Sequence, residues 1–109
     1  MTTVYKVLGQ INPTANTLTT AYTVPPANSA VISTVAVCNQ SATATTFRLA
    51  VQPAGATIAA KHYINYDTSL PGSDTITLTL GITLGATDVL SANVGSSSVS
   101  VNVFGSEIY

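Results

Sequence analysis

Hydrophobic and hydroxyl side chains alternate along most of this chain, and that alternation constrains the fold more than any other feature. In the segment Asp74–Ile82, Ile or Leu stands at every second position from Ile76 onward, and threonines precede most of them. A period of two is typical of a β-strand with one buried face. Because the other face carries hydroxyls in place of charges, the pattern favours a surface that packs against other protein.

The same alternation, interrupted by turn signals such as Pro25-Pro26, recurs along the chain and predicts about eight strands. Strands of this length and spacing predict an all-β fold, an antiparallel β-sandwich of jelly-roll or immunoglobulin-like topology, and the pattern does not choose between the two. All 109 residues are expected to form one domain. The predicted strands are Val4–Gln10, Leu18–Val24, Ala30–Asn39, Thr45–Gln52, Ile58–Tyr66, Asp74–Ile82, Asp88–Val94 and Val99–Phe104.

Charged residues make up only 6% of the chain, against about 25% in an ordinary soluble domain. The three cations, Lys6, Arg48 and Lys61, are too few for a basic patch, so we expect no nucleic-acid partner. A surface with so few charges and a net charge of −1 promotes association. We therefore expect a homo-oligomer whose bare surfaces are covered by neighbouring molecules.

The mean hydropathy is positive, at +0.41, which raises the question of a membrane segment. No stretch approaches ~20 uninterrupted apolar residues, so no membrane span is expected. The segment Met1–Lys6 lacks the basic start and apolar core of a signal peptide, and we expect the protein to be made and used without that export route.

Residues that could carry chemistry are scarce. His62, the only histidine, falls on the strand predicted at Ile58–Tyr66, and no Gly-x-Ser-x-Gly motif supplies a nucleophile for it. Cys38 is the only cysteine, so no intrachain disulfide can form, and it is expected to be a small buried hydrophobic residue. One His and one Cys are too few for zinc. We expect no enzymatic activity.

The four acids are scattered along the chain. Asp67 and Asp74 flank a predicted turn, and Asp88 precedes a strand, so all three are expected to bond local backbone. A calcium site in the Asp67–Asp74 turn is a minor alternative, because only two carboxylates are present there. No cofactor or bound metal is expected.

The tyrosines are the remaining side chains of interest. Counting by two places Tyr63 and Tyr66 on opposite faces of their predicted strand, so that one of them points away from the core. An outward tyrosine beside Lys61 and Asn65 suits a protein–protein interface. It suits equally an ordinary sandwich aromatic with a hydrated hydroxyl, and both interpretations stay open.

Short segments along nearly the whole chain are similar to a group of small β-rich virion structural proteins of tailed bacteriophages, including cyanophages. The resemblance implies a structural part of the particle and supplies no catalytic residue. Head decoration or cement, tail fibre and baseplate roles all stay open within it. The segments that carry the resemblance are Lys6–Gln10, Tyr22–Pro25, Val37–Asn39, Thr46–Val51, Tyr63–Asp67 and Phe104–Ile108.

The expected function is therefore that of a virion protein, a capsid decoration or cement protein that acts as a homotrimer and bridges subunits of the major capsid protein. Made in the host cytoplasm, it would reside in the virion. A tail, baseplate or fibre component is the second hypothesis, and a carbohydrate-binding adhesin module is the third. The expected interface residues are Thr3, Tyr5, Lys6, Arg48, Lys61, Tyr63, Tyr66, Ile108 and Tyr109.

Overall fold

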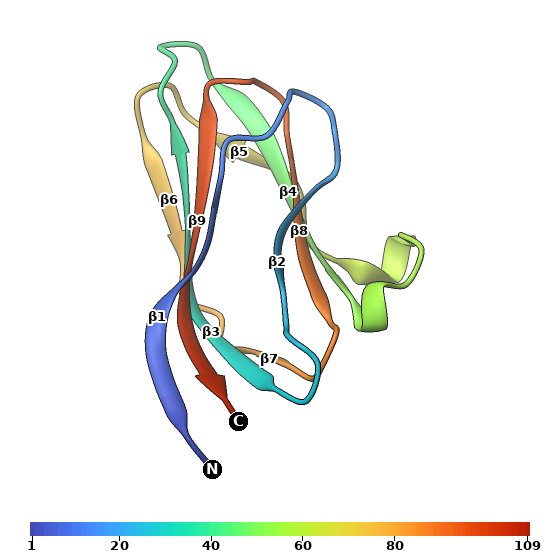
Figure 1. Ribbon diagram of the computed structural model, residues 1–109. Helices are drawn as coiled ribbons and strands as arrows, with labels where there is room; N and C mark the ends of the chain where they lie inside the picture. Colours follow the sequence, from blue (N-terminus) through green and yellow to red (C-terminus); the bar gives the residue numbers. More distant parts are fainter.

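Nine β-strands and two short 3₁₀ helices make up the computed structural model, which describes every residue from 1 to 109 (Figure 1). No helix in it is long and apolar enough to span a bilayer. The strands are β1 (Thr3–Ile11), β2 (Thr19–Thr23), β3 (Ser29–Asn39), β4 (Thr45–Gln52), β5 (Tyr63–Leu70), β6 (Thr75–Leu78), β7 (Ile82–Leu84), β8 (Val89–Val94) and β9 (Val99–Ile108), and the helices are η1 (Pro53–Gly55) and η2 (Ala60–His62).

The strands form two antiparallel sheets, which confirms the predicted β-sandwich. Sheet A has the order β1-β9-β3-β6, with β7 also paired to β3, and sheet B has the order β2-β8-β4-β5. Successive strands lie in opposite sheets, except for the β4–β5 hairpin and the β6–β7 pair. Counting β6 and β7 as one interrupted strand gives eight strands wound as a jelly roll, so the topology that the sequence left open is the jelly roll.

The core lies between the two sheets and is made of the inward side chains of both. It is a single cluster of 17 buried residues. Phe47 and Leu49 of β4 and the valines of β9 belong to this cluster, and each is at most 1% exposed. Strand β3 lies inside sheet A, between β9 and the β6–β7 pair, as its continuous apolar sequence predicts.

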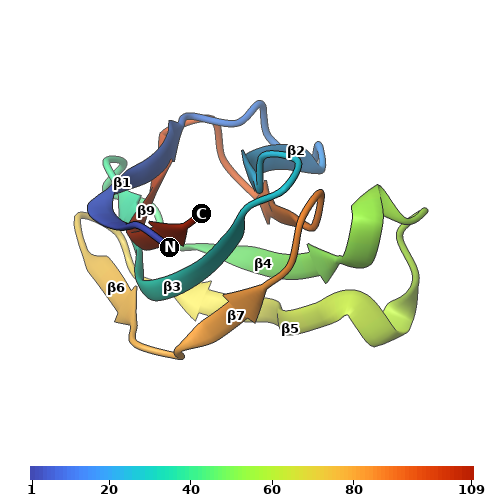
Figure 2. The same cartoon turned by 60° about the horizontal axis from the view of Figure 1, so that its bottom comes forward.

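Strand β5 begins later than predicted and ends later. Tyr63 pairs with Ala50, so the preceding residues run past the end of β4, where Pro53 starts η1. With no partner strand there, the chain turns through η2, and Figure 2 shows η1 and η2 projecting beyond the sandwich. The residues Asp67–Leu70, predicted as a turn, belong to the strand.

The predicted strand Asp74–Ile82 is broken in two. Strand β6 pairs with the second half of β3 and β7 pairs with the first half. Between them the chain turns at Gly81, whose φ of +63° is unfavourable for residues with a Cβ. The break lies opposite a register shift in β3 between Ile32 and Thr34, so the two irregularities belong together.

Strand β9 extends four residues beyond the predicted Phe104 and reaches Ile108. The extension is held on both sides, because it pairs with β1 and with β3. The two chain ends lie side by side (Figure 1), where Thr2 and Tyr109 exchange backbone hydrogen bonds. This extension carries Glu107 into the space between the sheets.

Candidate functional site

The outward face of sheet A is free of charged side chains. Partners in an antiparallel register point to the same side of the sheet, so the register defines this face. The residues of this sheet A face are Thr3, Tyr5, Val7, Gln10, Val31, Thr34, Ala36, Cys38, Thr75, Thr77, Thr83, Ser100, Asn102, Phe104, Ser106 and Ile108.

Three large apolar side chains stand together on the sheet A face. Val7 is the register partner of Phe104, and Tyr5 follows two positions along β1 on the same side. All three are exposed, and Tyr5 is 85% exposed. This apolar patch is surrounded by hydroxyl and amide groups, which need not lose an ionic hydration shell when another protein covers them.

The carboxylate of β9 points the other way, between the sheets, and the ammonium of β1 reaches it from the surface. Glu107 is only 5% exposed, and its Oε1 lies 2.7 Å from Lys6 Nζ. The hydroxyl of Tyr22 donates a 2.6 Å hydrogen bond to Glu107 Oε2. Lys6, which was predicted to be an interface residue, keeps an exposed side chain, and its ammonium is held by this buried carboxylate.

Each member of this network alters the titration of the others. The hydrogen bonds from Lys6 and then from Tyr22 hold the pKa of Glu107 below its usual value. Burial, followed by the bond to Glu107, raises the pKa of Tyr22. The bond to Glu107 also raises the pKa of Lys6. The network therefore keeps one fixed negative charge neutralised inside the sandwich.

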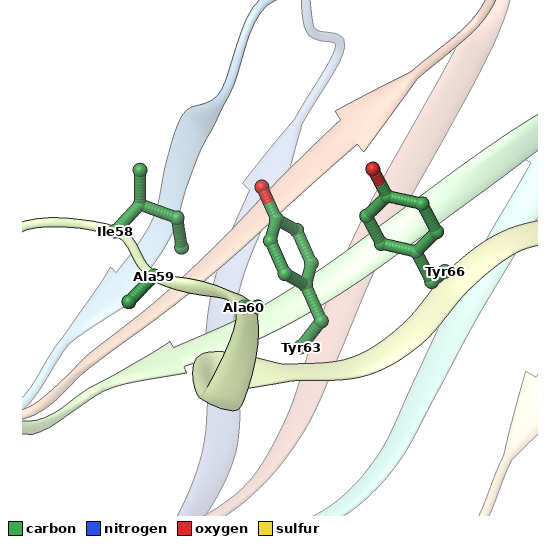
Figure 3. A pocket seen from close by; sticks show the side chains of 5 residues that line it. All are labelled: Ile58, Ala59, Ala60, Tyr63 and Tyr66. Atoms are coloured by element: carbon green, nitrogen blue, oxygen red, sulfur yellow. The ribbon is translucent and has the colours of Figure 1, made fainter.

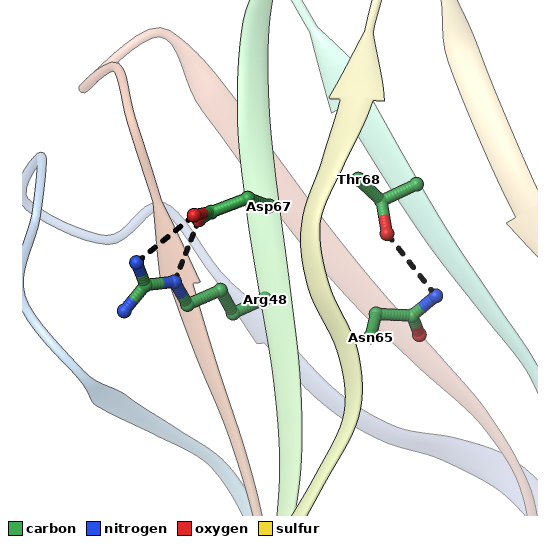
Figure 4. Close-up of polar contacts among 4 residues, drawn as sticks. All are labelled: Arg48, Asn65, Asp67 and Thr68. Atoms are coloured by element: carbon green, nitrogen blue, oxygen red, sulfur yellow. Dashed lines mark hydrogen bonds and ion pairs between the residues drawn. The ribbon is translucent and has the colours of Figure 1, made fainter. Parts of the chain in front are cut away.

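The outward face of sheet B carries a second cluster, formed by Tyr63, Tyr66, Arg48 and Asp67, which we call the tyrosine–arginine cluster. The two rings meet edge to face with centroids 5.1 Å apart. The Arg48 guanidinium carbon lies 3.9 Å from the centroid of the Tyr66 ring. Arg48 also donates to both oxygens of Asp67, from Nε at 2.7 Å and from Nη2 at 3.2 Å (Figure 4).

The pairing corrects one prediction. Arg48, an expected interface residue, pairs with an acid of the same chain, Asp67. Asp67 in turn bonds Arg48, where a bond to turn backbone was expected. The hydrogen bond between them lowers the pKa of Asp67 and raises the pKa of Arg48. The pair carries no net charge.

The prediction that Tyr63 and Tyr66 occupy opposite faces is wrong. Strand β5 contains extra residues relative to β4, with register shifts on both sides of Leu49. Asp67 sits in the bulge with a φ of +50°. A bulge interrupts the alternation of side chains between the two faces of a strand. Here it places the rings of Tyr63 and Tyr66 on the same face. Asn65, between them, takes the register position opposite Leu49.

Two hollows flank the ridge that Tyr66 and Arg48 form. One, of about 570 Å³, is mainly apolar (Figure 3), and its lining residues are Ile58, Ala59, Ala60, Tyr63 and Tyr66. The other, of about 250 Å³, contains no hydrophobic residue, and its lining residues are Asn16, Thr46, Arg48, Asp67, Asn93 and Gly95. The ridge therefore separates an aromatic hollow, lined by Tyr66, from a polar hollow, lined by Arg48.

The nine predicted interface residues separate into groups that the sequence did not distinguish. Thr3, Tyr5 and Ile108 lie on the sheet A face, and Tyr109 is exposed at its end. Lys6 reaches the buried Glu107 from the surface. The other four belong to the opposite side of the molecule: Arg48, Tyr63 and Tyr66 form the cluster on sheet B, and Lys61 is exposed on η2.

His62 is not on a strand, as was predicted, but at the end of η2. It is buried, and its Nδ1 accepts a 3.0 Å hydrogen bond from the backbone N–H of Ala59. No three His, Cys, Asp or Glu side chains lie close enough together to hold a metal ion. Cys38 is half-buried on the sheet A face, where full burial was expected.

Two of the acids behave as turn residues, as predicted. The carboxylate of Asp74 accepts from the backbone N–H of Thr75 at 2.8 Å. That of Asp88 accepts from Gly85 and Ala54, both at 2.8 Å. Asp74 therefore holds local backbone, and Asp88 holds both the local backbone at Gly85 and the distant backbone of η1 at Ala54.

Sequence reasoning missed Glu107, Asn16 and Asn93. Glu107 lies an even number of positions after the inward valines of β9, so it points to the same side of the strand. The alternation was not followed to Glu107 because the strand was predicted to end at Phe104. Asn16 and Asn93 are brought to the polar hollow by the topology alone, from a loop and from β8. Comparison with known protein families, with curated proteins and with solved structures finds no match to this chain.

Proposed function

We propose that this protein is a structural component of a phage virion, a capsid decoration or cement protein that assembles as a homotrimer and bridges subunits of the major capsid protein. The resemblance of six short segments to virion proteins of tailed phages supports the proposal. So does the sheet A face, which is the single observation that carries it. The site chemistry adds no competing activity, because the acids and His62 are occupied in structural bonds.

The sheet A face suits burial because no charge has to leave water when it is covered. Stranding an unpaired charge in a contact costs several kcal/mol. On this face the register leaves only apolar, hydroxyl, amide and thiol side chains to be covered. The same lack of charge makes the contact insensitive to salt.

The size of the sheet A face matches what a specific contact requires. Four strands ~4.8 Å apart and about nine residues long, at ~3.3 Å per residue, cover roughly 600 Å². A protein interface of standard size buries about 800 Å² on each partner. The face itself therefore supplies about three quarters of one such interface, and the side chains at its rim would supply the rest.

A protein that binds only the assembled shell stabilises the shell by mass action. The contribution grows as RT ln(1 + [L]/Kd), where [L] is the free concentration of the protein and Kd its dissociation constant from the shell. No chemical step is needed, so the functional requirement is a complementary surface.

A cryo-EM map of the particle tests this proposal. We expect density for this sandwich at regular positions on the head, near local threefold axes, with sheet A turned towards its neighbours. Density confined to the tail or neck would replace the cement role with a tail, baseplate or fibre role. Absence from the particle would refute a virion role of either kind.

A further inference from the structure

Two exposed apolar surfaces of this protein have unlike shapes. The apolar patch on the sheet A face stands out from the molecule, since Tyr5 is 85% exposed and Val7 and Phe104 lie beside it. The aromatic hollow is recessed, with a volume of about 570 Å³ between the segment Ile58–Ala60 and the tyrosines of β5 (Figure 3). One surface therefore projects where the other is hollow.

The patch and the hollow cannot meet within one chain. The patch belongs to β1 and β9 of sheet A, whereas the hollow lies where β5 of sheet B meets η2. Strands β1 and β5 are edge strands of different sheets, and Figure 2 shows η2 projecting away from β1. Any contact between the two surfaces therefore joins two separate chains.

The symmetry of a homotrimer requires two unlike surfaces of this kind. In a ring of three identical chains, each chain contacts the chain before it through one surface and the chain after it through another. A surface that pairs with its own copy gives a twofold dimer instead, and such a contact cannot close a ring of three. The sheet A face of the proposed homotrimer therefore needs a different surface of the same chain as its complement.

The aromatic hollow matches the patch in chemistry. The polar hollow contains no hydrophobic residue, and an apolar ring placed there would take water from the pair of Arg48 and Asp67. The aromatic hollow is mainly apolar, and its volume lies within the roughly 300–1,000 Å³ of pockets that enclose whole small molecules. It therefore has room for an aromatic side chain from another molecule.

Insertion also adds to the area of the contact. The sheet A face by itself covers roughly 600 Å² of the about 800 Å² that each partner of a standard interface buries. The walls of a hollow cover the sides of an inserted ring, which a flat partner would leave exposed. The rings of Tyr63 and Tyr66, already edge to face at 5.1 Å, offer such a wall to a third ring.

We infer that the apolar patch of one chain inserts into the aromatic hollow of a second copy of this chain, an inference that rests on the proposed homotrimer. Tyr5, the most exposed residue of the patch, is the side chain that enters the hollow. A buried tyrosine is a common anchor of protein interfaces. Neither surface includes a charged residue, so no charge has to leave water when they meet.

A charge placed in the hollow tests this contact by sedimentation equilibrium. Ala60 is exposed and lines the hollow, so Ala60→Lys should leave the fold intact and reduce the mass from that of three chains to that of one. Ala56→Lys is the matched control, because Ala56 is exposed nearby but does not line the hollow. It should retain the mass of three chains. A dispersed ¹⁵N spectrum of each variant shows that it is folded.

A mixture of two variants shows which surface meets which. Phe104→Lys alters the patch and keeps the hollow, and Ala60→Lys does the reverse, so one intact contact can form between them. In ¹⁵N-labelled A60K, unlabelled F104K should shift the backbone amides of Tyr5 and Val7 in a saturable way. With the labels exchanged, the shifts should appear at Tyr63 and Tyr66 of F104K. Further unlabelled A60K in place of F104K should shift neither set.

Two results would overturn the inference. An A60K protein with the mass of three chains would show that the hollow is not part of the contact, and the homotrimer would remain. The absence of saturable shifts in the mixture would show that the patch and the hollow do not meet. A wild type with the mass of one chain would refute the homotrimer itself, so a failure of the proposed assembly can be told apart from a failure of this contact.

Discussion

At the scale of single residues, the buried carboxylate of Glu107 distinguishes this sandwich from a purely apolar one. Its two oxygens are bonded by Lys6 from β1 and by Tyr22 from β2. The network therefore ties both sheets to β9 at the end of the molecule where the chain termini meet. Removing one partner of such a network is strongly destabilising, because it leaves the other charge unpaired.

Replacing Glu107 by glutamine should reduce both the stability and its dependence on pH. The pKa of Glu107 lies below the ordinary value of 4.5, so its stabilising contribution is complete above pH 4.5 and disappears as the pH falls through the lowered pKa. In E107Q, urea unfolding should show a loss of about 1–3 kcal/mol at pH 7. Its stability should then decline less steeply below pH 4.5.

Asp74→Asn provides the control for the loss of one negative charge, since Asp74 is exposed and bonds only the neighbouring backbone N–H of Thr75. Asp67, whose pKa is also lowered, stays in place in both variants and leaves them a shared acid dependence. An E107Q variant with the wild-type slope below pH 4.5 would show that Glu107 is not the group responsible.

Which residues are buried could be predicted from the sequence, but which side chains meet could not. Alternation placed Phe47 and Leu49 in the core, where they are found. The same counting separated Tyr63 from Tyr66, because a period of two assumes an unbroken ladder. The bulge that unites the rings arises from the register between β4 and β5, which is a property of two strands together.

At the scale of elements, a strand forms only where a partner strand is available. The residues before Tyr63 alternate as a strand does, yet they form η2, because β4 has ended at their level. The segment Gly105–Ile108 was left out of the last predicted strand, yet it is a strand because it lies between β1 and β3. Local pattern therefore predicted most strand centres correctly and missed these ends.

The break between β6 and β7 depends on the backbone conformation of Gly81. Its φ of +63° is unfavourable for a residue with a Cβ, although no atom lies within 4 Å of where a Cβ would stand. Gly81→Ala should therefore cost about 1 kcal/mol of unfolding free energy through backbone strain alone, as measured by urea unfolding.

Gly85→Ala is the comparison variant for this prediction. Gly85 does not have a positive φ, and a Cβ there would meet Asp88 only at an ordinary 3.6 Å. Its substitution should change the unfolding free energy by no more than about 0.5 kcal/mol. Equal losses in the two variants would show that the turn at Gly81 is not what makes a glycine necessary.

At the scale of the whole molecule, the few charges are distributed unevenly. Lys6 neutralises the buried Glu107 from the surface, and Arg48 and Asp67 neutralise each other on sheet B. The sheet A face is left without charge. Composition alone predicted a protein that packs against others, but only the strand order shows which surface is bare, because residues from four segments of the sequence combine to form it.

Phe104→Lys should disrupt the assembly that the sheet A face is proposed to form. The substitution places an ammonium beside Val7 and Tyr5, where it would lose its hydration if the face were covered. Phe104 is outside the buried core, so the variant should fold as the wild type does. Thr23→Lys, at an exposed position on the outward side of β2, is the matched control.

Sedimentation equilibrium of these three proteins tests the central claim most directly. Each chain has a mass of 11.1 kDa. We expect the mass of three chains for the wild type and for T23K, and the mass of one chain for F104K. A wild type that sediments as a single chain at every concentration, or an F104K protein that assembles as the wild type does, would contradict it.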